Sequence, residues 1–447
     1  MTNLPLLLAP LMRVLRLVPV LAVLFYAAPA FAQDGNWWEG ISSGSPNYSG
    51  RPREAERTPP KPEVLNDLRA NDVPWRSDET LAAIEKAIDF YQHIVSKGGW
   101  AAIPGNRMMR PGDDDERVPH VRRRLRITGE LAGGSSYDDY TFDTALEAAV
   151  VRYQEKNGLR ASGRVDQPTL AALNIPAEER LAQLKLNHER ILELLKSPPE
   201  ERYVLVNVPA FQLEAVERYQ TVLRHRVIVG RPERQTPSLK ATIKALNFYP
   251  FWRVPDSVAQ LDLIPRLRKE PEYLAKEQIR VVSGDFNGPQ LDPTVIDWTQ
   301  ADARTIKFKQ DPGLQNALGL VRIDMQNEHG VYMHDTPLKP LFQQRSRPFS
   351  AGCVRVQDVF ELVEWIARLE PGWERPGRVK DVLDQGQALD LALSRPVPVY
   401  FAYITAWAEP NGRIEFRPDI YKRDGSIASR DYFDPDAPPL PQSGLAP

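Results

Sequence analysis

The spacing of the apolar residues changes near residue 200, and this change limits the folds that are open to the chain. Upstream, apolar residues recur at helical spacing in the segments 78–97, 142–159 and 177–196, and Pro198-Pro199 ends the last of these. Downstream, "YVLVNVPAFQLEAVE" and "YQTVLRHRVIVG" alternate apolar and polar residues over strand lengths, which indicates antiparallel strands with at least one solvated face. We therefore predict an α+β multidomain protein in which a helical part precedes a mostly antiparallel β domain.

Segments of different composition divide the chain further. The β pattern returns at 330–336, 396–409 and 412–421, whereas residues 256–312 are polar, contain prolines and are partly helical. We predict that 256–312 is an insertion that lies over the sheet. Residues 33–64 and 426–447 are rich in Gly, Ser, Pro and charge, a composition typical of a linker and a flexible tail.

The first 32 residues have the features of an export signal. Arg13 and Arg16 precede an apolar run from Leu17 to Ala28, and Ala30-Phe31-Ala32 is a small-x-small cleavage site. The apolar stretch 4–12 leaves an uncleaved membrane anchor open as an alternative. No second apolar run of about 18 residues follows. We expect a periplasmic protein, with membrane attachment only through this N-terminal segment.

Charge and cysteine content exclude some functions. Lys+Arg 57 against Asp+Glu 59 gives a net charge of -2, so no global positive field exists to bind nucleic acid. The chain has a single cysteine, Cys353, which cannot form an internal disulfide in an oxidising compartment. Cys353 is therefore an inert buried thiol, half of an intermolecular bridge, or a reactive nucleophile.

Residues 116–176 form a compact helical unit between a helical scaffold (65–115) and a further scaffold helix (177–200). Helical spacing alone predicts that Ala145, Leu146, Ala149, Val150 and Tyr153 form a helix core. The unit also resembles the three-helix peptidoglycan-binding module. The resemblance rests on Val150, Tyr153-Gln154, Gly158-Leu159, Gly163, Thr169 and Ala172-Leu173-Asn174. Ser162 replaces the usual Asp of that module, so the resemblance supports the fold more than glycan binding.

The segment "VYMHDTPLKPLFQQRSRPFSAGCVRV" (331–356) carries the strongest chemical pattern. Cys353 follows His334 along the chain, and two strands joined by this loop can bring the base to the thiol. Gly352 allows a close backbone approach, so the amides near Cys353 could bind an oxyanion. The simpler alternative to catalysis is that Cys353 is a small buried apolar side chain and that His334 is near it in the sequence by chance. One Cys with scattered His residues predicts no metal site.

The order of motifs resembles the L,D-transpeptidase catalytic domain of the YkuD type, in its YcbB-like branch. The motifs are "VIVGRPERQTPSL" (227–239), "FYPFWRVP" (248–255), "VYMHDTP" (331–337) and "FSAGCVRV" (349–356). The resemblance extends over most of residues 65–425. It implies a catalytic domain at 201–425 with an inserted lid at about 256–312, no cofactor and no metal.

The resemblance also implies roles for individual residues. Cys353 would be the nucleophile, and His334 the general base and then the general acid. Amides of Gly352 and Cys353, with Tyr332, would polarise the substrate carbonyl. Two further residues would support the site: Ser350 through hydrogen bonds, and Arg355 by holding the turn or facing a substrate carboxylate. Aromatic residues Trp252 and Tyr249 could line the donor pocket. Ala351 stands where many members of the family have His.

The implied reaction is peptidoglycan cross-linking between the third residues of two tetrapeptide stems through a cysteine thioester. An outer-membrane lipoprotein is an alternative acceptor. With water as acceptor, the same site would act as an L,D-carboxypeptidase or a cross-link hydrolase. The alternative that involves no catalysis is a cell-wall binding protein.

Overall fold

The computed structural model describes residues 65, 67–68, 71–133 and 139–425. The predicted export signal (1–32), linker (33–64) and tail (426–447) lie outside the described residues. Within the part that is described, no helix combines the length and apolar character needed to cross a membrane.

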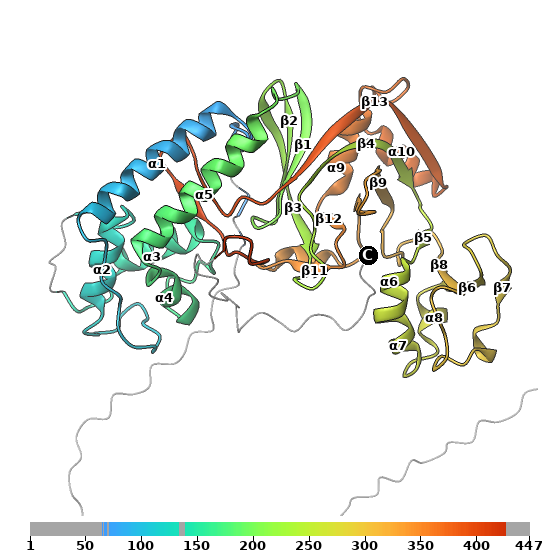
Figure 1. Cartoon of the computed structure of the whole chain (residues 1–447), viewed down its shortest axis with the longest axis horizontal. Coiled ribbons are helices and arrows are strands. Elements are labelled where there is room, and N and C mark those ends of the chain that lie inside the picture. Colours follow the sequence, from blue (N-terminus) through green and yellow to red (C-terminus); the bar gives the residue numbers. More distant parts are fainter. Residues whose placement is uncertain (1–64, 66, 69–70, 134–138, 426–447) are drawn as a thin grey trace, which may run out of the picture. The chain divides into compact units, whose positions relative to one another are not determined.

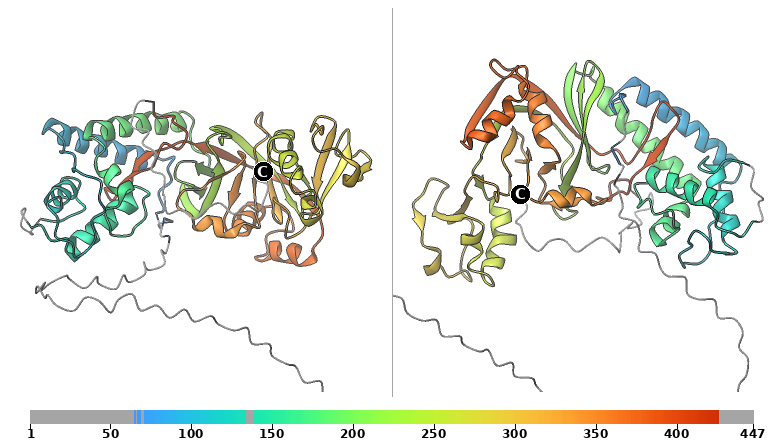
Figure 2. Two further views of the ribbon diagram at one scale, coloured as in Figure 1. Left: turned by 90° about the horizontal axis from the view of Figure 1, so that it is seen from below. Right: turned by 180° about the vertical axis from the view of Figure 1, so that it is seen from behind.

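Two long helices form the scaffold. Helix α1 (Asp78–Ser96) begins after Ser77, whose hydroxyl accepts the N–H of Thr80 at 3.1 Å, and α5 (Ala177–Leu195) begins after Pro176. The two helices pack side by side (Figure 2). Their apolar stripes share a core with Tyr203, Leu205 and the hairpin of β14 (Ala406–Ala408) and β15 (Ile414–Phe416). The last strands of the chain thus pack against the scaffold that precedes the sheet.

The helical unit at 116–176 contains α2 (Val118–Ile127), α3 (Thr144–Lys156) and α4 (Gln167–Leu173). Asp143 and Asp166 cap α3 and α4 by accepting the N–H groups of Leu146 and Thr169. This unit has a core of its own, so it folds around its own apolar residues. The predicted helix core is confirmed for Leu146, Ala149, Val150 and Tyr153, whereas Ala145 is exposed in the first turn of α3, at the edge of the buried face.

A nine-stranded sheet dominates the second part of the chain (Figure 1). Its strands are β1 (Arg202–Asn207), β2 (Gln212–Glu217), β3 (Gln220–Gly230), β4 (Leu239–Phe248), β9 (Val321–Met325), β10 (Met333–His334), β11 (Pro348–Ser350), β12 (Val354–Val356) and β13 (Leu389–Ala402). The strand order is β11-β3-β12-β10-β9-β4-β13-β1-β2, and β2 also pairs with β3, so the sheet closes on itself. Strand pairs β1–β13, β10–β12 and β11–β3 are parallel and the other pairs antiparallel, which confirms a mostly antiparallel domain.

The two faces of the sheet have different partners. Val204 and Val206 face the main core, to which α9 (Val359–Ala367) and α10 (Arg378–Gln385) also contribute. Tyr203 and Leu205 alternate with them and face the scaffold core. The prediction of a solvated face is therefore wrong for β1 and β2, which are buried along nearly their whole length because other elements pack on both faces.

The predicted insertion has its own small sheet and core. It contains β5 (Trp252–Arg253), α6 (Asp256–Val258), the π-helical turn η1 (Ala259–Leu263), α7 (Ile264–Leu267), α8 (Tyr273–Lys276), β6 (Ile279–Ser283), β7 (Gln290–Leu291), the 3-10 turn η2 (Pro293–Val295) and β8 (Ile306–Gln310). The strands are ordered β5-β8-β6-β7. Its core runs from Trp252 to Leu318, a few residues beyond the predicted 256–312 at each end. Tyr332 and Ala351 pack against this core, which puts the insertion next to the Cys353 motif.

Candidate active site

Parallel pairing of β10 with β12 brings the His334 and Cys353 motifs together. Met333 is in register with Val354, and His334 with Arg355. Met333 and Val354 are buried in the main core, so their neighbours in sequence face the opposite side of the sheet. One register step back, the N–H of Val354 donates to the carbonyl of Tyr332 at 3.0 Å. Residues Tyr332, His334, Cys353 and Arg355 consequently share one face of two adjacent strands.

His334 is fully buried and has one defined hydrogen bond. Its Nδ1 contacts the carbonyl oxygen of Asp335. A carbonyl only accepts, so Nδ1 must carry the proton and Nε2 must carry a lone pair. Nε2 is buried and has no partner among the described residues. Burial, together with the nearby charge of Arg355, lowers the pKa of His334 to about 3. The ring is therefore neutral at pH 7 and offers Nε2 as a base.

Cys353 is a free thiol with only 8% of its surface exposed. Burial raises the pKa of this thiol to about 11, while hydrogen bonding by Tyr332 and the charges of Arg355 and Arg322 oppose the rise. The resting pair is thus a neutral thiol and a neutral imidazole. Proton transfer to His334 must then accompany attack by the sulfur rather than precede it.

The turn before Cys353 is held by Ser350. Its hydroxyl donates to the carbonyl of Cys353 at 2.6 Å and accepts the N–H of Gly352 at 3.1 Å. Gly352 has φ of 124°, which favours glycine. Because the Gly352 amide already has a partner, it is not free to bind an oxyanion in this structure, contrary to the expectation from the sequence. The Cys353 N–H has no partner among the described residues and is the available backbone donor.

Tyr332 lies between the histidine and the inserted segment. Its ring is 5.7 Å from that of His334 in an edge-on arrangement, and the Arg322 guanidinium lies 5.5 Å from its centroid. Burial raises the pKa of Tyr332 well above its ordinary value, so its hydroxyl stays protonated and can donate. Trp252 belongs to the core against which Tyr332 packs. A side-chain hydrogen bond with Trp252 partly opposes the rise in the pKa of Tyr332.

Two arginines lie beside the histidine in the sheet. Arg322 is in register with His334 on β9, and its side chain donates to Asn247 at 3.1 Å and pairs with Asp324 at 3.2 Å. Arg355 is 2% exposed, and within the described residues its guanidinium has neither a hydrogen bond nor an ion pair. Burial lowers the pKa of Arg355 to about 10. A buried, unpaired cation next to a nucleophile is suited to receive an anionic group of a ligand.

Other candidates lie elsewhere. Tyr249 does not join the thiol, since its hydroxyl donates to the carbonyl of Leu383 in α10 at 2.6 Å. His329, five residues before His334 in the sequence, has an exposed side chain that lies 3.5 Å from Glu328. Arg322 was missed from the sequence, although the alternation in "VRIDM" already indicated a polar side on that strand. Across the described ranges, no group of three or more His, Cys, Asp or Glu side chains could hold a metal ion.

Comparison with known proteins agrees with this geometry. Residues 201–397 match the YkuD family, described as the L,D-transpeptidase catalytic domain, and residues 114–173 match a family described as "Putative peptidoglycan binding domain". The chain is also 31% identical over 246 residues to a Haemophilus influenzae protein named "Putative L,D-transpeptidase", a match over 55% of this chain and 48% of that protein. The chain thus spans about half the length of this relative.

Solved structures give weaker similarities. A Stackebrandtia nassauensis L,D-transpeptidase has 13% identity and a TM-score of 0.24, covering 67% of this chain and 97% of that one. A Xylanimonas cellulosilytica L,D-transpeptidase fragment has 13% identity and a TM-score of 0.21, covering 67% and 98%. These TM-scores are too low to support an inference about this chain.

Proposed function

We propose that the chain cross-links peptidoglycan through a thioester on Cys353, a proposal supported by its matches to the YkuD L,D-transpeptidase catalytic domain and to the peptidoglycan binding domain family. The donor is a tetrapeptide stem, and the acceptor is the side-chain amine of the third residue of a second stem. The described residues that carry this reaction belong to 201–425, and the module at 116–176 supports binding to the polymer.

In the first half-reaction, Nε2 of His334 takes the proton of Cys353 while Sγ attacks the carbonyl carbon of the third residue. The oxyanion that forms is stabilised by the N–H of Cys353 and the hydroxyl of Tyr332. His334 then returns the proton to the departing nitrogen, and the terminal D-Ala leaves as a free amine. The product of this half-reaction is a thioester between the donor stem and Cys353.

In the second half-reaction, the acceptor amine attacks the thioester carbonyl and gives a proton to Nε2 of His334. The carbon–sulfur bond breaks, the thiolate recovers the proton, and an amide bond joins the two stems. We assign Arg355 to a carboxylate of the donor, because a buried guanidinium without a partner gains most from an anion. The inserted segment, which packs on Tyr332 and Ala351, would exclude water and so favour the amine as acceptor.

One observation supports this proposal above the others. The Nδ1 contact with Asp335 leaves Nε2 of His334 buried, unprotonated and unpartnered, on the strand face that also carries Cys353. Nε2 of His225 is also buried without a partner, so what sets His334 apart is its place on the strand face that carries Cys353.

The proposal also covers location and partners. Cross-linking of the cell wall requires action outside the cytoplasmic membrane, and we propose the periplasm. An outer-membrane lipoprotein remains an alternative acceptor, since its lysine side chain would supply the same kind of amine.

The test is intact mass spectrometry of the protein after incubation with a carbapenem and, separately, with tetrapeptide muropeptides. We expect an adduct on Cys353 and cross-linked dimers among the products. Cys353→Ala and His334→Ala should remove both. His329→Ala is the matched control for the histidine because His329 is exposed, and it should retain them.

Two other results have defined meanings. Tripeptide products without dimers would make the protein an L,D-carboxypeptidase. A folded protein with a free thiol that forms no adduct would contradict the enzymatic proposal and favour a cell-wall binding protein.

A further inference from the structure

The loop between β3 and β4 lies directly against the nucleophile turn. Loop 230–238, which begins at the last residue of β3, lies within ordinary van der Waals contact of the turn, because a Cβ built on Gly352 would be 3.7 and 3.8 Å from the carbonyl oxygens of Gln235 and Arg234. The loop is itself tightly folded, because a Cβ on Gly230 would be 2.1 Å from the Arg234 carbonyl oxygen. The main chain of loop 230–238 therefore forms one wall of the turn that carries Cys353.

Thr236 joins loop 230–238 to the turn through its hydroxyl. The side chain is fully buried. Its Oγ1 accepts the N–H of Gly230 at 2.8 Å and donates to the carbonyl oxygen of Gly352 at 2.8 Å. One hydroxyl thus uses both its donor and its acceptor capacity on main-chain groups of the two segments.

Tyr421 fixes Thr236 from the other side. Its hydroxyl accepts the N–H of Thr236 at 3.2 Å and donates to the carbonyl of Gly230 at 2.5 Å. Its ring stacks on Tyr403 at 5.6 Å, and its own N–H donates to the Tyr403 hydroxyl at 2.8 Å. Nearby, Arg423 donates to the Gln235 side chain at 2.7 Å. The segment 417–425 therefore clamps loop 230–238.

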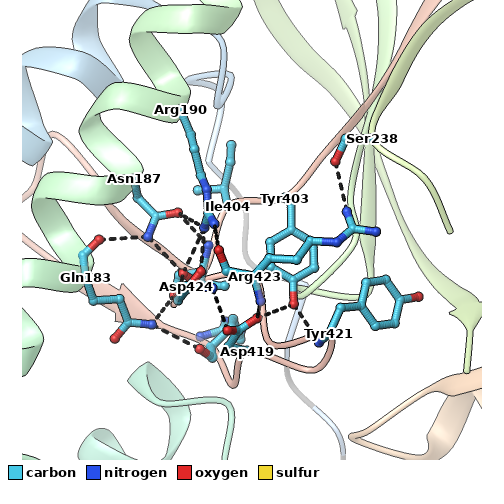
Figure 3. Close-up of polar contacts among 12 residues, drawn as sticks. Gln183, Asn187, Arg190, Ser238, Tyr403, Ile404, Asp419, Tyr421, Arg423 and Asp424 are labelled. Carbon is cyan, nitrogen blue, oxygen red and sulfur yellow. Dashed lines mark hydrogen bonds and ion pairs between the residues drawn. The ribbon is translucent and has the colours of Figure 1, made fainter. Parts of the chain in front are cut away.

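That segment is anchored in turn to scaffold helix α5 (Figure 3). Arg190 pairs with Asp424 at 2.7 Å, and Thr405 donates to the same carboxylate at 2.6 Å. Asn187 donates to the Thr405 hydroxyl and accepts the Thr405 N–H, both at 2.8 Å. The network thus extends from α5 to the Gly352 carbonyl without an exposed side chain at its centre.

The Gly352 carbonyl matters because of peptide planarity. The carbonyl of Gly352 and the N–H of Cys353 belong to one planar trans unit, in which they point in opposite directions. Because the Thr236 hydroxyl fixes the direction of the Gly352 carbonyl, it also fixes the opposite direction of the Cys353 N–H. That N–H is the unpartnered backbone donor assigned to the oxyanion.

We propose that Thr236 is a positioning residue that aims the Cys353 N–H at the oxyanion, and that Tyr421 supports it. This inference rests on the proposed acyl transfer, but it goes beyond it by adding two residues that touch neither substrate nor thiol. Because they act on the oxyanion donor, their loss should slow acylation and leave direct alkylation of the thiol unchanged.

The experiment compares these two reactions of Cys353 in the full-length protein. Carbapenem acylation passes through an oxyanion, whereas iodoacetamide alkylation is a displacement that forms none. Thr236→Val removes the hydroxyl at nearly constant volume, and we expect acylation to fall by roughly 10- to 100-fold, less than the loss of a complete oxyanion donor. Thr236→Ser should recover acylation to within about threefold of the native protein, because it restores the bridging hydroxyl. Tyr421→Phe should cause a smaller loss, since the Thr236–Gly352 bond remains.

Thr299→Val is the matched control, because Thr299 is an exposed threonine of the insertion, and it should acylate normally. Circular dichroism on each variant checks folding. Native acylation rates in Thr236→Val would overturn the inference. So would an equal loss of acylation and alkylation that Thr236→Ser does not repair. Failure of the native protein to acylate at all would instead contradict the proposed function.

Discussion

Arg355 should cost the protein stability, and replacing it should show how much. The side chain is buried beside Cys353 and has no anionic partner among the described residues. Its pKa falls from 12.5 to about 10 on folding, because burial disfavours the charged form. At 1.36 kcal/mol per pKa unit, this shift corresponds to about 3 kcal/mol. The folded-state pKa lies below the unfolded value, so the penalty is fully present at every pH below about 10.

Arg355→Met tests this magnitude, since methionine fills a similar length without charge. Replacing a buried charge by an apolar side chain often stabilises a protein by about 1–4 kcal/mol. We expect a gain of about 1–3 kcal/mol, measured as a higher midpoint in thermal unfolding at pH 7. Arg218→Met is the matched control because its side chain is 84% exposed, and it should change stability by less than about 0.5 kcal/mol.

The same variant should lose activity. A charge-assisted hydrogen bond to a carboxylate contributes about 1.5–3 kcal/mol, so kcat/KM for a tetrapeptide donor should fall roughly 10- to 100-fold. The kcat/KM of Arg355→Lys should lie between those of the native protein and Arg355→Met, because lysine keeps the charge but cannot form two parallel hydrogen bonds to a carboxylate. A variant that is less stable and equally active would refute the reasoning, since it would mean that the guanidinium has a structural partner and no substrate role.

Three further predictions concern other groups. At pH 8, iodoacetamide should alkylate Cys353 roughly 100-fold more slowly than a thiol of pKa 9, with a rate that keeps rising toward pH 11, and a plateau near pH 9 would contradict this. Burial raises the pKa of Glu214 to about 7, so stability should fall by up to about 3 kcal/mol as pH rises from 4.5 through 7, and thermal unfolding of Glu214→Gln should lack this loss. Asp262 ties the insertion to Arg234 at 2.5 Å, so Asp262→Asn should raise the hydrolysis-to-transfer ratio by up to about fivefold, whereas Asp256→Asn, a change within the insertion, should not.

Much of the fold follows from local pattern. Helix α3 begins directly after Asp143, whose side chain caps it, and it repeats apolar residues every three or four positions, so neighbouring residues determine its limits. The sequence pattern did not predict that β1 is buried on both faces, because the residues near 202–207 do not indicate that α1 and α5 cover its outer face. The insertion was predicted from its polarity, yet its own core depends on contacts between Trp252 and residues far along the chain.

In the candidate site too, some features follow from local sequence and others depend on tertiary structure. Cys353, His334 and the glycine before the cysteine occur in a short, recognisable order, so the sequence alone indicated which groups could react. The sequence also led us to expect that the Gly352 N–H would bind the oxyanion, whereas in the structure this N–H donates to the hydroxyl of Ser350. Hydrogen bonding within a turn depends on backbone angles that a motif does not specify.

By itself, the sequence determined which chemistry the chain can carry, because residue types and short-range spacing fix the thiol, the base and the secondary structure around them. Only the tertiary structure decided how these groups are tuned. The contact of Thr236 with Gly352 joins residues far apart in the sequence, the unpaired charge of Arg355 results from its burial in the sheet, and the neutral tautomer of His334 depends on the orientation of the Asp335 carbonyl in the folded backbone. Such pairings depend on the register of the closed sheet and on exclusion of water, and both are properties of the whole packed chain.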